Sequence, residues 1–232
     1  HLSGISGLAA EHGDLPVGCD LPAGNMQADE PHFLIKRHGF PTFDCCQIIV
    51  APNGDLNNEK FRKSKKGCFV MSKKVLILSS SPRKGGNSET LAAAFAKGAQ
   101  EAGNQVETVH LREKNYGFCR GCLACQKLGH CVIRDDAVEV TAKMHDADVL
   151  VFATPVYYYS VSGQLKTMLD RANPLYNTDY AFTKAYLLAA AAEDEPETVE
   201  GTRTAVQGWV DCFPRCELVD TIFAGGVNDV GD

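Results

Sequence analysis

Four cysteines lie close together in the middle of the chain, in the stretch FCRGCLACQKLGHC at residues 118–131, which we call the cysteine segment. Cys119, Cys122, Cys125 and Cys131 follow the pattern Cys-x2-Cys-x2-Cys-x5-Cys. Four thiolates on a compact loop can bind a [4Fe–4S] cluster. On a helix, the first three would instead span an arc of about 120° and pack as one face of thiols, since each residue advances about 100°.

Two other interpretations of the cysteine segment stay open. Zinc sites made of cysteines alone exist, although Cys-x2-Cys-x2-Cys is tight for one tetrahedral ion. The other interpretation is that the thiols are free or redox-active, with no metal between them. The acidic pair Asp135 and Asp136 that follows is predicted to cap the next helix rather than to bind a metal. The cysteine pattern therefore indicates metal or redox chemistry without choosing between them.

A second candidate site is the loop SSSPRKGGNS at residues 79–88, which we call the phosphate loop. It follows a short apolar run and precedes a helical pattern, so hydroxyls, a guanidinium and glycine-freed amides converge at a helix N-terminus. A phosphate monoester needs this combination of helix dipole, N–H donors and fixed positive charge. The sequence contains neither G-x-x-x-x-G-K-[ST] nor G-x-G-x-x-G, so it predicts neither a triphosphate hydrolase nor a Rossmann dinucleotide site.

A third stretch, TPVYYYSVSG at residues 154–163, follows another apolar run. A turn here would present backbone amides and aromatic faces at the edge of a sheet. If the sheet has the strand order 2-1-3-4-5, this turn and the phosphate loop are neighbours at the switch point where such sheets bind ligands. We therefore expect a flat aromatic cofactor with its phosphate on the phosphate loop and its ring against residues 155–158. Tyr159 is expected to be an ordinary packing residue.

The elements that must position these loops are strands alternating with helices. Repeated strand–helix units predict a doubly wound parallel sheet covered on both faces. The predicted strands cover residues 74–80, 105–111, 148–153, 185–192 and 217–224, and the predicted helices cover residues 88–103, 136–146, from 162 onward, and 197–211. Ser88 and Ser162 are the predicted N-caps of two of these helices. A fifth strand needs a further covering helix, so we expect the chain to be truncated after it.

The paired stretches SSSPRKGGNS and ADVLVFATPVYYYSVSGQLKTMLDR, with the cysteines between them, resemble the NAD(P)H-dependent FMN reductase family of flavodoxin-like proteins over residues 71–232. The resemblance implies a five-stranded α/β sheet of order 2-1-3-4-5 that lacks the family's last helix. It also implies that residues 192–195 approach the flavin ring. The residues that it implies for FMN are Ser81, Arg83, Asn87 and Ser88 at the phosphate, and Thr154, Pro155, Val156, Tyr157 and Tyr158 at the ring.

The function implied by this resemblance is an FMN-dependent oxidoreductase that passes electrons from NAD(P)H to a quinone, a flavin or another small acceptor. No side chain is expected to act as a general acid or base, because the flavin carries the chemistry. The alternative is an iron–sulfur flavoprotein, with a [4Fe–4S] cluster on Cys119, Cys122, Cys125 and Cys131, or a flavodoxin-type electron carrier without its own substrate. The family also suggests a homodimer.

Composition limits the partners and the organisation of the chain. The formal net charge is −6, and the one basic run, residues 60–66, is short, so we expect no nucleic-acid partner. The longest apolar run, residues 185–192, is too short for a bilayer, so we expect no membrane span. Ten cysteines without a recognisable signal peptide favour a reducing, cytoplasmic location. Residues 1–70 are rich in glycine and proline and are expected to form an irregular extension to a domain at 71–232.

Overall fold

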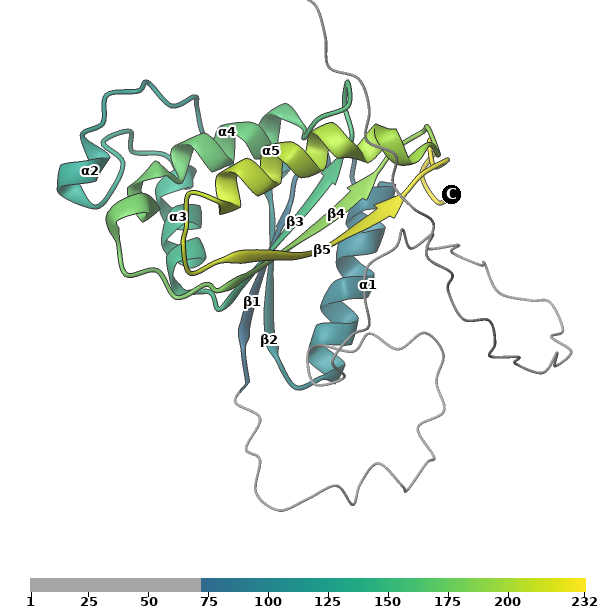
Figure 1. Ribbon diagram of the computed structural model, residues 1–232, viewed down its shortest axis with the longest axis horizontal. Coiled ribbons are helices and arrows are strands. Elements are labelled where there is room, and N and C mark those ends of the chain that lie inside the picture. The colour runs from purple at the N-terminus through teal and green to yellow at the C-terminus, as the bar shows by residue number, and fades with distance from the viewer. Residues whose placement is uncertain (1–71) are drawn as a thin grey trace, which may run out of the picture. The chain divides into compact units, whose positions relative to one another are not determined.

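The computed structural model describes residues 72–232, and the expected extension at residues 1–70 lies outside the described residues. In the described part, strands alternate with helices (Figure 1). The strands are β1 (Lys74–Ser79), β2 (Gln105–His110), β3 (Val149–Pro155), β4 (Lys184–Ala190) and β5 (Glu217–Ala224). The α-helices are α1 (Asn87–Glu101), α2 (Cys125–Leu128), α3 (Asp136–Asp146), α4 (Gly163–Arg171) and α5 (Glu200–Val210). Short 3-10 turns are η2 (Leu111–Glu113), η3 (Asn173–Asn177) and η4 (Pro196–Val199).

The five strands form one parallel sheet in the order β2-β1-β3-β4-β5, which confirms the predicted order. The strand β2 therefore lies on one side of β1, and β3, β4 and β5 follow on the other side, so the order of the strands reverses between β1 and β3. These two strands are directly paired, with Ser79 opposite Ala153 at their carboxyl ends. The loops that leave β1 and β3 consequently start side by side, at the place where open sheets of this kind bind ligands.

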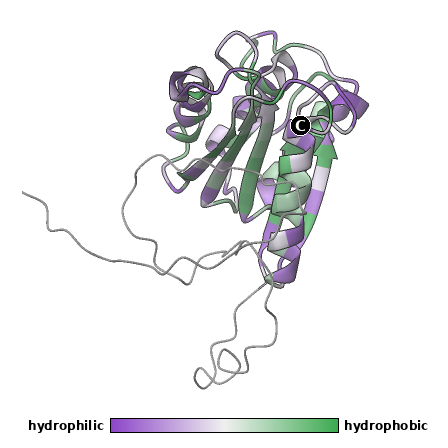
Figure 2. Cartoon of the chain, turned by 90° about the vertical axis from the view of Figure 1, so that its right-hand side faces the viewer, coloured by the Kyte–Doolittle hydropathy of each residue, from purple (hydrophilic) through white to green (hydrophobic). Residues whose placement is uncertain are grey.

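Helices cover both faces of the sheet. Helix α1 packs on one face through Ala92, Phe95 and Ala99, while α3, α4 and α5 pack on the other. Figure 2 shows the strands as largely hydrophobic and the helices as mixed, because a strand inside two layers is buried on both sides whereas a helix is buried on one. None of the helices in residues 72–232 is long and apolar enough to cross a membrane.

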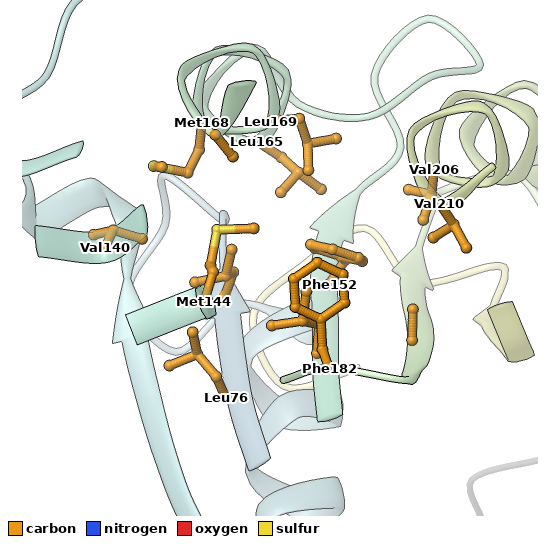
Figure 3. Close-up of a cluster of buried hydrophobic side chains, with 14 of the residues drawn as sticks. Leu76, Val140, Met144, Phe152, Leu165, Met168, Leu169, Phe182, Val206 and Val210 are labelled. Carbon is orange, nitrogen blue, oxygen red and sulfur yellow. The ribbon is translucent and has the colours of Figure 1, made fainter. Parts of the chain in front are cut away.

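The larger core cluster holds the three-helix layer against the sheet (Figure 3). Val140 and Met144 of α3, Leu165 and Met168 of α4, and Phe152 of β3 are all fully buried in it. Burying a side chain of this size stabilises the fold by about 1.5–3 kcal/mol. Because α4 lies over the centre of the sheet, its two ends are fixed relative to the strand ends.

The predicted N-caps can be compared with the observed starts of two helices, α1 and α4. Ser162 is the N-cap of α4 and accepts a hydrogen bond from the Leu165 N–H, as predicted. The prediction for Ser88 was wrong, because α1 begins two residues earlier with Gly86 as its N-cap. Gly86 is followed by Asn87 in a helical conformation, so Ser88 lies inside the first turn. This turn is therefore left without a side-chain cap.

Candidate functional site

The phosphate loop is held in shape by its own backbone and by Glu89. The buried Ser81 Oγ accepts a hydrogen bond from the Arg83 N–H at 3.2 Å and donates to the Arg83 carbonyl at 3.0 Å. Gly85 has a left-handed φ of 69°, a conformation that favours glycine. Its N–H donates to Glu89 Oε2 at 2.8 Å, and Arg112 donates to the same oxygen at 2.8 Å. These contacts within the chain fix the turn of the loop.

The end of this loop has the donors that a phosphate requires. No side chain caps α1, and the first N–H groups of a helix have no acceptor within the helix. The hydroxyls of Ser81 and Ser88 are buried beside this terminus, and Ser79 Oγ, at the start of the loop, is buried without a hydrogen-bond partner among the described residues. The N–H groups of this terminus and the neighbouring hydroxyls fit the phosphate of FMN chemically, although the Ser81 hydroxyl already bonds to Arg83.

Two of the predicted phosphate ligands are engaged with residues that follow β5. Arg83 Nη1 donates to the Asn228 carbonyl at 2.9 Å, and Asn87 Nδ2 donates to the Asp229 carbonyl at 2.8 Å. The structure thus brings residues 228–229 against the phosphate loop, which the sequence did not indicate. Arg83 is otherwise exposed, so its guanidinium can reach a neighbouring anion by changing rotamer.

A buried chain of hydrogen bonds joins the phosphate loop to the loop after β3. Ser80 donates from both its N–H and its Oγ to the Ala153 carbonyl, at 2.9 and 3.0 Å. Ser162 Oγ donates to Ser80 Oγ at 2.9 Å, and the Ser162 N–H donates to Thr154 Oγ1 at 3.0 Å. The structure therefore brings the two predicted parts of the site together. Thr154 and Pro155 are buried at the end of β3, and Val156 is half-buried next to them.

The tyrosines after β3 form a tight turn. The Tyr157 N–H donates to the Ser160 carbonyl at 2.9 Å, and the Ser160 N–H donates back at 3.1 Å. Tyr158 and Tyr159 both have left-handed φ values, 48° and 60°, which bulky residues rarely adopt. Strain of this kind is typical of functional sites. Tyr158 is fully exposed at the tip and Tyr157 is partly exposed, so both rings are open to a ligand.

The tyrosine turn is fastened by the loop after β4 and by α5. A hydrogen bond with Glu193 raises the pKa of Tyr159, and Thr198 Oγ1 donates to Glu193 Oε2 at 3.3 Å. The carbonyl of Tyr159 lies so close to Gly201 of α5 that a Cβ at Gly201 would overlap it. Tyr159 is thus partly exposed and fastened by polar contacts, rather than an ordinary packing residue as predicted.

The cysteine segment begins and ends near Arg171, at the far end of α4. Just before it, the Tyr116 hydroxyl donates to the Gln164 carbonyl in the first turn of α4, and burial raises the pKa of Tyr116 to about 12. Further on, the buried Cys125 Sγ accepts from Asn173 Nδ2 at 3.0 Å, beyond the end of α4. Figure 1 shows α2 at the end of α4 that lies away from the tips of β3, β4 and β5. A nine-residue helix is about 14 Å long, so Cys125 lies well away from the phosphate loop rather than beside it.

The four thiols have different surroundings. Cys119 and Cys122 are exposed, Cys125 is buried and Cys131 is half-buried. Nowhere in residues 72–232 are three or more histidine, cysteine or acidic side chains arranged to hold a metal ion. As placed, the four side chains therefore do not fit a [4Fe–4S] cluster or a zinc ion, and their role as ligands stays a prediction.

Two residues that shape the site, Glu89 and Gly201, were missed in the sequence, and so was the contact made by Glu193, which lies in the predicted range 192–195. Glu89 lies three residues after the N-cap Gly86, which is the spacing of a capping box, although it reaches Gly85 rather than the cap. Gly201 interrupts a helical pattern, and such a glycine often marks a close approach of another backbone. Nothing in the local sequence of Glu193 indicates that it contacts Tyr159, because that contact joins loops from different strands.

The fold defined by this sheet and these loops is shared with solved flavodoxin-like reductases. An example is the NAD(P)H:quinone oxidoreductase from Methanothermobacter marburgensis, with a TM-score of 0.54 and 23% identity over 70% of this chain and 87% of that chain. Likeness at this identity establishes the fold. The sequence goes further: the model of the NADPH-dependent FMN reductase family matches residues 73–211, and the chain belongs to this family.

Two relatives carry the same name, iron-sulfur flavoprotein. One, from Archaeoglobus fulgidus, is 39% identical over 101 residues, which cover 44% of this chain and 46% of the relative. Another, from Methanosarcina thermophila, is 30% identical over 155 residues, covering 66% of this chain and 81% of the relative. The matched part of this chain thus spans about half the length of the first relative and most of the second.

Proposed function

We propose that this protein binds FMN and acts as an oxidoreductase that passes electrons from NAD(P)H to a quinone, a flavin or another small acceptor. The observation that carries the proposal is the uncapped N-terminus of α1, joined through Ser80 and Ser162 to the loop after β3. Membership of the FMN reductase family supports the same cofactor. When bound, FMN supplies the hydride and electron chemistry, and the protein supplies position and electrostatics.

The residues of this chain have separate roles in the proposal. Ser81, Ser88 and the first N–H groups of α1 bind the phosphate, and Arg83 adds a positive charge. Thr154, Pro155 and Val156 form the wall of the ring site, while Tyr157 and Tyr158 offer aromatic surfaces that limit water at the ring. Asn87 fixes residues 228–229 over the loop through its bond to Asp229. No side chain in the proposal moves a proton.

The phosphate contacts can be tested by comparing FMN with riboflavin, which lacks the phosphate. We expect FMN to bind much more tightly than riboflavin in a fluorescence titration. Ser81→Ala and Arg83→Gln should each weaken FMN by about 10- to 100-fold, because a hydrogen bond to a charged group contributes about 1.5–3 kcal/mol. Riboflavin binding should not change in these variants, and Lys97→Gln, on the exposed side of α1, should bind both as the wild type does.

Two results would count against the proposal. Equal affinity for FMN and riboflavin would show that the phosphate loop does not bind the phosphate. If the flavin-loaded protein does not oxidise NADH or NADPH in the presence of a quinone or free FMN, it is not a reductase of this kind. That second result would leave an electron carrier, the alternative predicted from the sequence. The homodimer and the cytoplasmic location belong to the same proposal, and light scattering of the purified protein tests the dimer.

The second candidate function is that of an iron–sulfur flavoprotein. The spacing of Cys119, Cys122, Cys125 and Cys131 favours it, and so do the relatives of that name. Since the four side chains do not converge as placed, the cysteine segment would have to rearrange to hold a cluster. Anaerobic treatment with ferrous iron and sulfide tests this: bound iron and a broad visible absorption that Cys119→Ser abolishes would support it, and their absence would contradict it.

A further inference from the structure

Arg171, the last residue of α4, is charged and yet only 1% exposed. A buried charge is tolerated when it is paired and its donors are satisfied, and here both terminal nitrogens have partners while Nε has no hydrogen-bond partner among the described residues. Two of its terminal N–H groups donate to the two carboxylate oxygens of Asp135, each at 2.7 Å. This planar, bidentate arrangement is the strongest form of an arginine–carboxylate pair. It lowers the pKa of Asp135, so both partners stay charged near neutral pH.

The other two terminal donors of Arg171 reach the chain on both sides of the cysteine segment. Nη1 donates to the carbonyl of Gly117, just before the segment, at 2.8 Å. Nη2 donates to the carbonyl of Ile133, just after it, at 3.2 Å. Asp135 strengthens this closure, because it also accepts from the Gly117 N–H at 3.1 Å and caps α3 at the Ala137 N–H. One guanidinium thus joins the entry and the exit of a loop that contains all four clustered cysteines.

The closed loop gives its thiols unequal access to solvent. Cys125 is buried against Asn173, two residues after Arg171, whereas Cys119 and Cys122 are exposed. Cys131 lines a hollow of about 690 Å³ together with Asp135, so a small reagent can already approach it. Cys125 is therefore the thiol whose access depends most on the loop staying closed.

We propose that Arg171 is a positioning residue that closes the cysteine segment into a loop and thereby sets which of its thiols solutes can reach. Lysine cannot replace it, because an ammonium has three donors and no planar fork, whereas the guanidinium makes four hydrogen bonds here, two of them to Asp135. The functional meaning of this loop rests on the proposed flavin-dependent oxidoreductase. The closure itself is a property of thiol access and holds or fails without FMN.

The experiment measures how fast each cysteine of the full chain reacts with iodoacetamide, with the modified peptides quantified by mass spectrometry. Arg171→Lys removes the two carbonyl contacts, and Asp135→Asn weakens the paired charge while keeping the shape of the side chain. The matched control is Lys166→Gln, which removes a cation from the exposed face of the same helix, where Lys166 pairs with Asp170. Cys216, half-buried outside the segment, reports on the fold as a whole.

We expect Cys125 to react about tenfold faster in Arg171→Lys and severalfold faster in Asp135→Asn, because opening of the loop exposes it. Cys119 and Cys122 should change little, and Lys166→Gln should match the wild type. FMN affinity, measured separately, should stay within about threefold of the wild type, since the phosphate loop lies at the other end of α4. A Cys125 rate that stays within about twofold of the wild type in Arg171→Lys would overturn the proposal. Parallel acceleration of Cys216 in both variants would also overturn it, because Arg171 would then stabilise the whole fold rather than the loop.

Discussion

Gly201 shows how one residue can fix the shape of a site to which it does not belong. It lies in α5, where glycine costs about 1 kcal/mol relative to alanine, and yet the close approach of the Tyr159 carbonyl leaves no room for a side chain. The tyrosine turn already contains two left-handed residues, so it has little freedom to move away. Because it has no side chain, Gly201 therefore allows the Tyr159 carbonyl to pack directly against α5.

We predict that Gly201→Ala lowers the free energy of unfolding by about 1–3 kcal/mol, as expected when a methyl group is forced into occupied space. The displaced turn should also weaken FMN binding. Urea denaturation and a flavin titration would measure the two effects.

Gly208 provides the matched control for Gly201, because it lies in the same helix and a Cβ there meets no atom within 4 Å. Gly208→Ala should stabilise the protein by up to about 1 kcal/mol through helix propensity alone. If Gly201→Ala stabilises the protein as Gly208→Ala does, the contact with Tyr159 does not constrain the turn.

At the scale of elements, α4 connects two regions that are far apart in the sequence. Its N-cap, Ser162, contacts Ser80 in the phosphate loop and Thr154 after β3. Its last residue, Arg171, closes the cysteine segment. The helix is held down by Leu165, Met168 and Leu169, which are buried in the core. The position of one region is thus tied to that of the other through one rigid helix.

We predict that Ser162→Ala lowers the free energy of unfolding by about 0.5–2 kcal/mol, the usual cost of losing an N-cap. The same change breaks the bond to Ser80, so FMN should bind more weakly. Ser160→Ala, a change of hydroxyl in the same loop, is the control, because none of these contacts uses the Ser160 side chain. Equal effects of the two substitutions on unfolding and on FMN affinity would show that the cap and the bond to Ser80 are unimportant.

At the scale of the whole molecule, two acid–arginine pairs make stability depend on pH. Burial opposes the charge of Glu89, but hydrogen bonds from the Gly85 N–H and from Arg112 outweigh it and lower its pKa. Hydrogen bonds from Arg171 lower the pKa of Asp135. A carboxylate whose pKa is lower in the folded state stabilises the fold above its unfolded pKa, near 4, and loses that contribution as the pH falls through the folded pKa.

We therefore predict that the free energy of unfolding falls steeply below about pH 4, in urea denaturation at a series of pH values. The double variant with Glu89→Gln and Asp135→Asn should be less stable at neutral pH and should show a shallower acid dependence. Glu101→Gln, an exposed substitution at the end of α1, should follow the wild type. A double variant with the wild-type acid dependence would show that other carboxylates control it.

The strands themselves, the positions of the two candidate loops and the cap at Ser162 were predictable from local sequence, whereas the order of the strands came from the resemblance to the reductase family. Apolar runs identify buried strands, and the loop composition after β1 indicates a phosphate site whatever the rest of the chain does. The helix that starts at Asn87 was harder to place, because Ser88 is the better cap by residue type, whereas the backbone turn at Gly85 and Gly86 starts the helix earlier. Local preference predicts that a helix begins nearby, and the path of the loop decides at which residue.

The sequence by itself therefore determined the alternation of strands and helices and predicted the phosphate loop and the loop after β3 as parts of a site, because these patterns depend on residues close together in the chain. Only the tertiary structure decided that the cysteine segment extends to the far end of α4, that Arg171 closes it, and that residues 228–229 lie on the phosphate loop. Each of these contacts joins residues 38 or more positions apart, some from opposite ends of the domain. Their partners are selected by the packing of α4 and by the order of the strands, which no local pattern encodes.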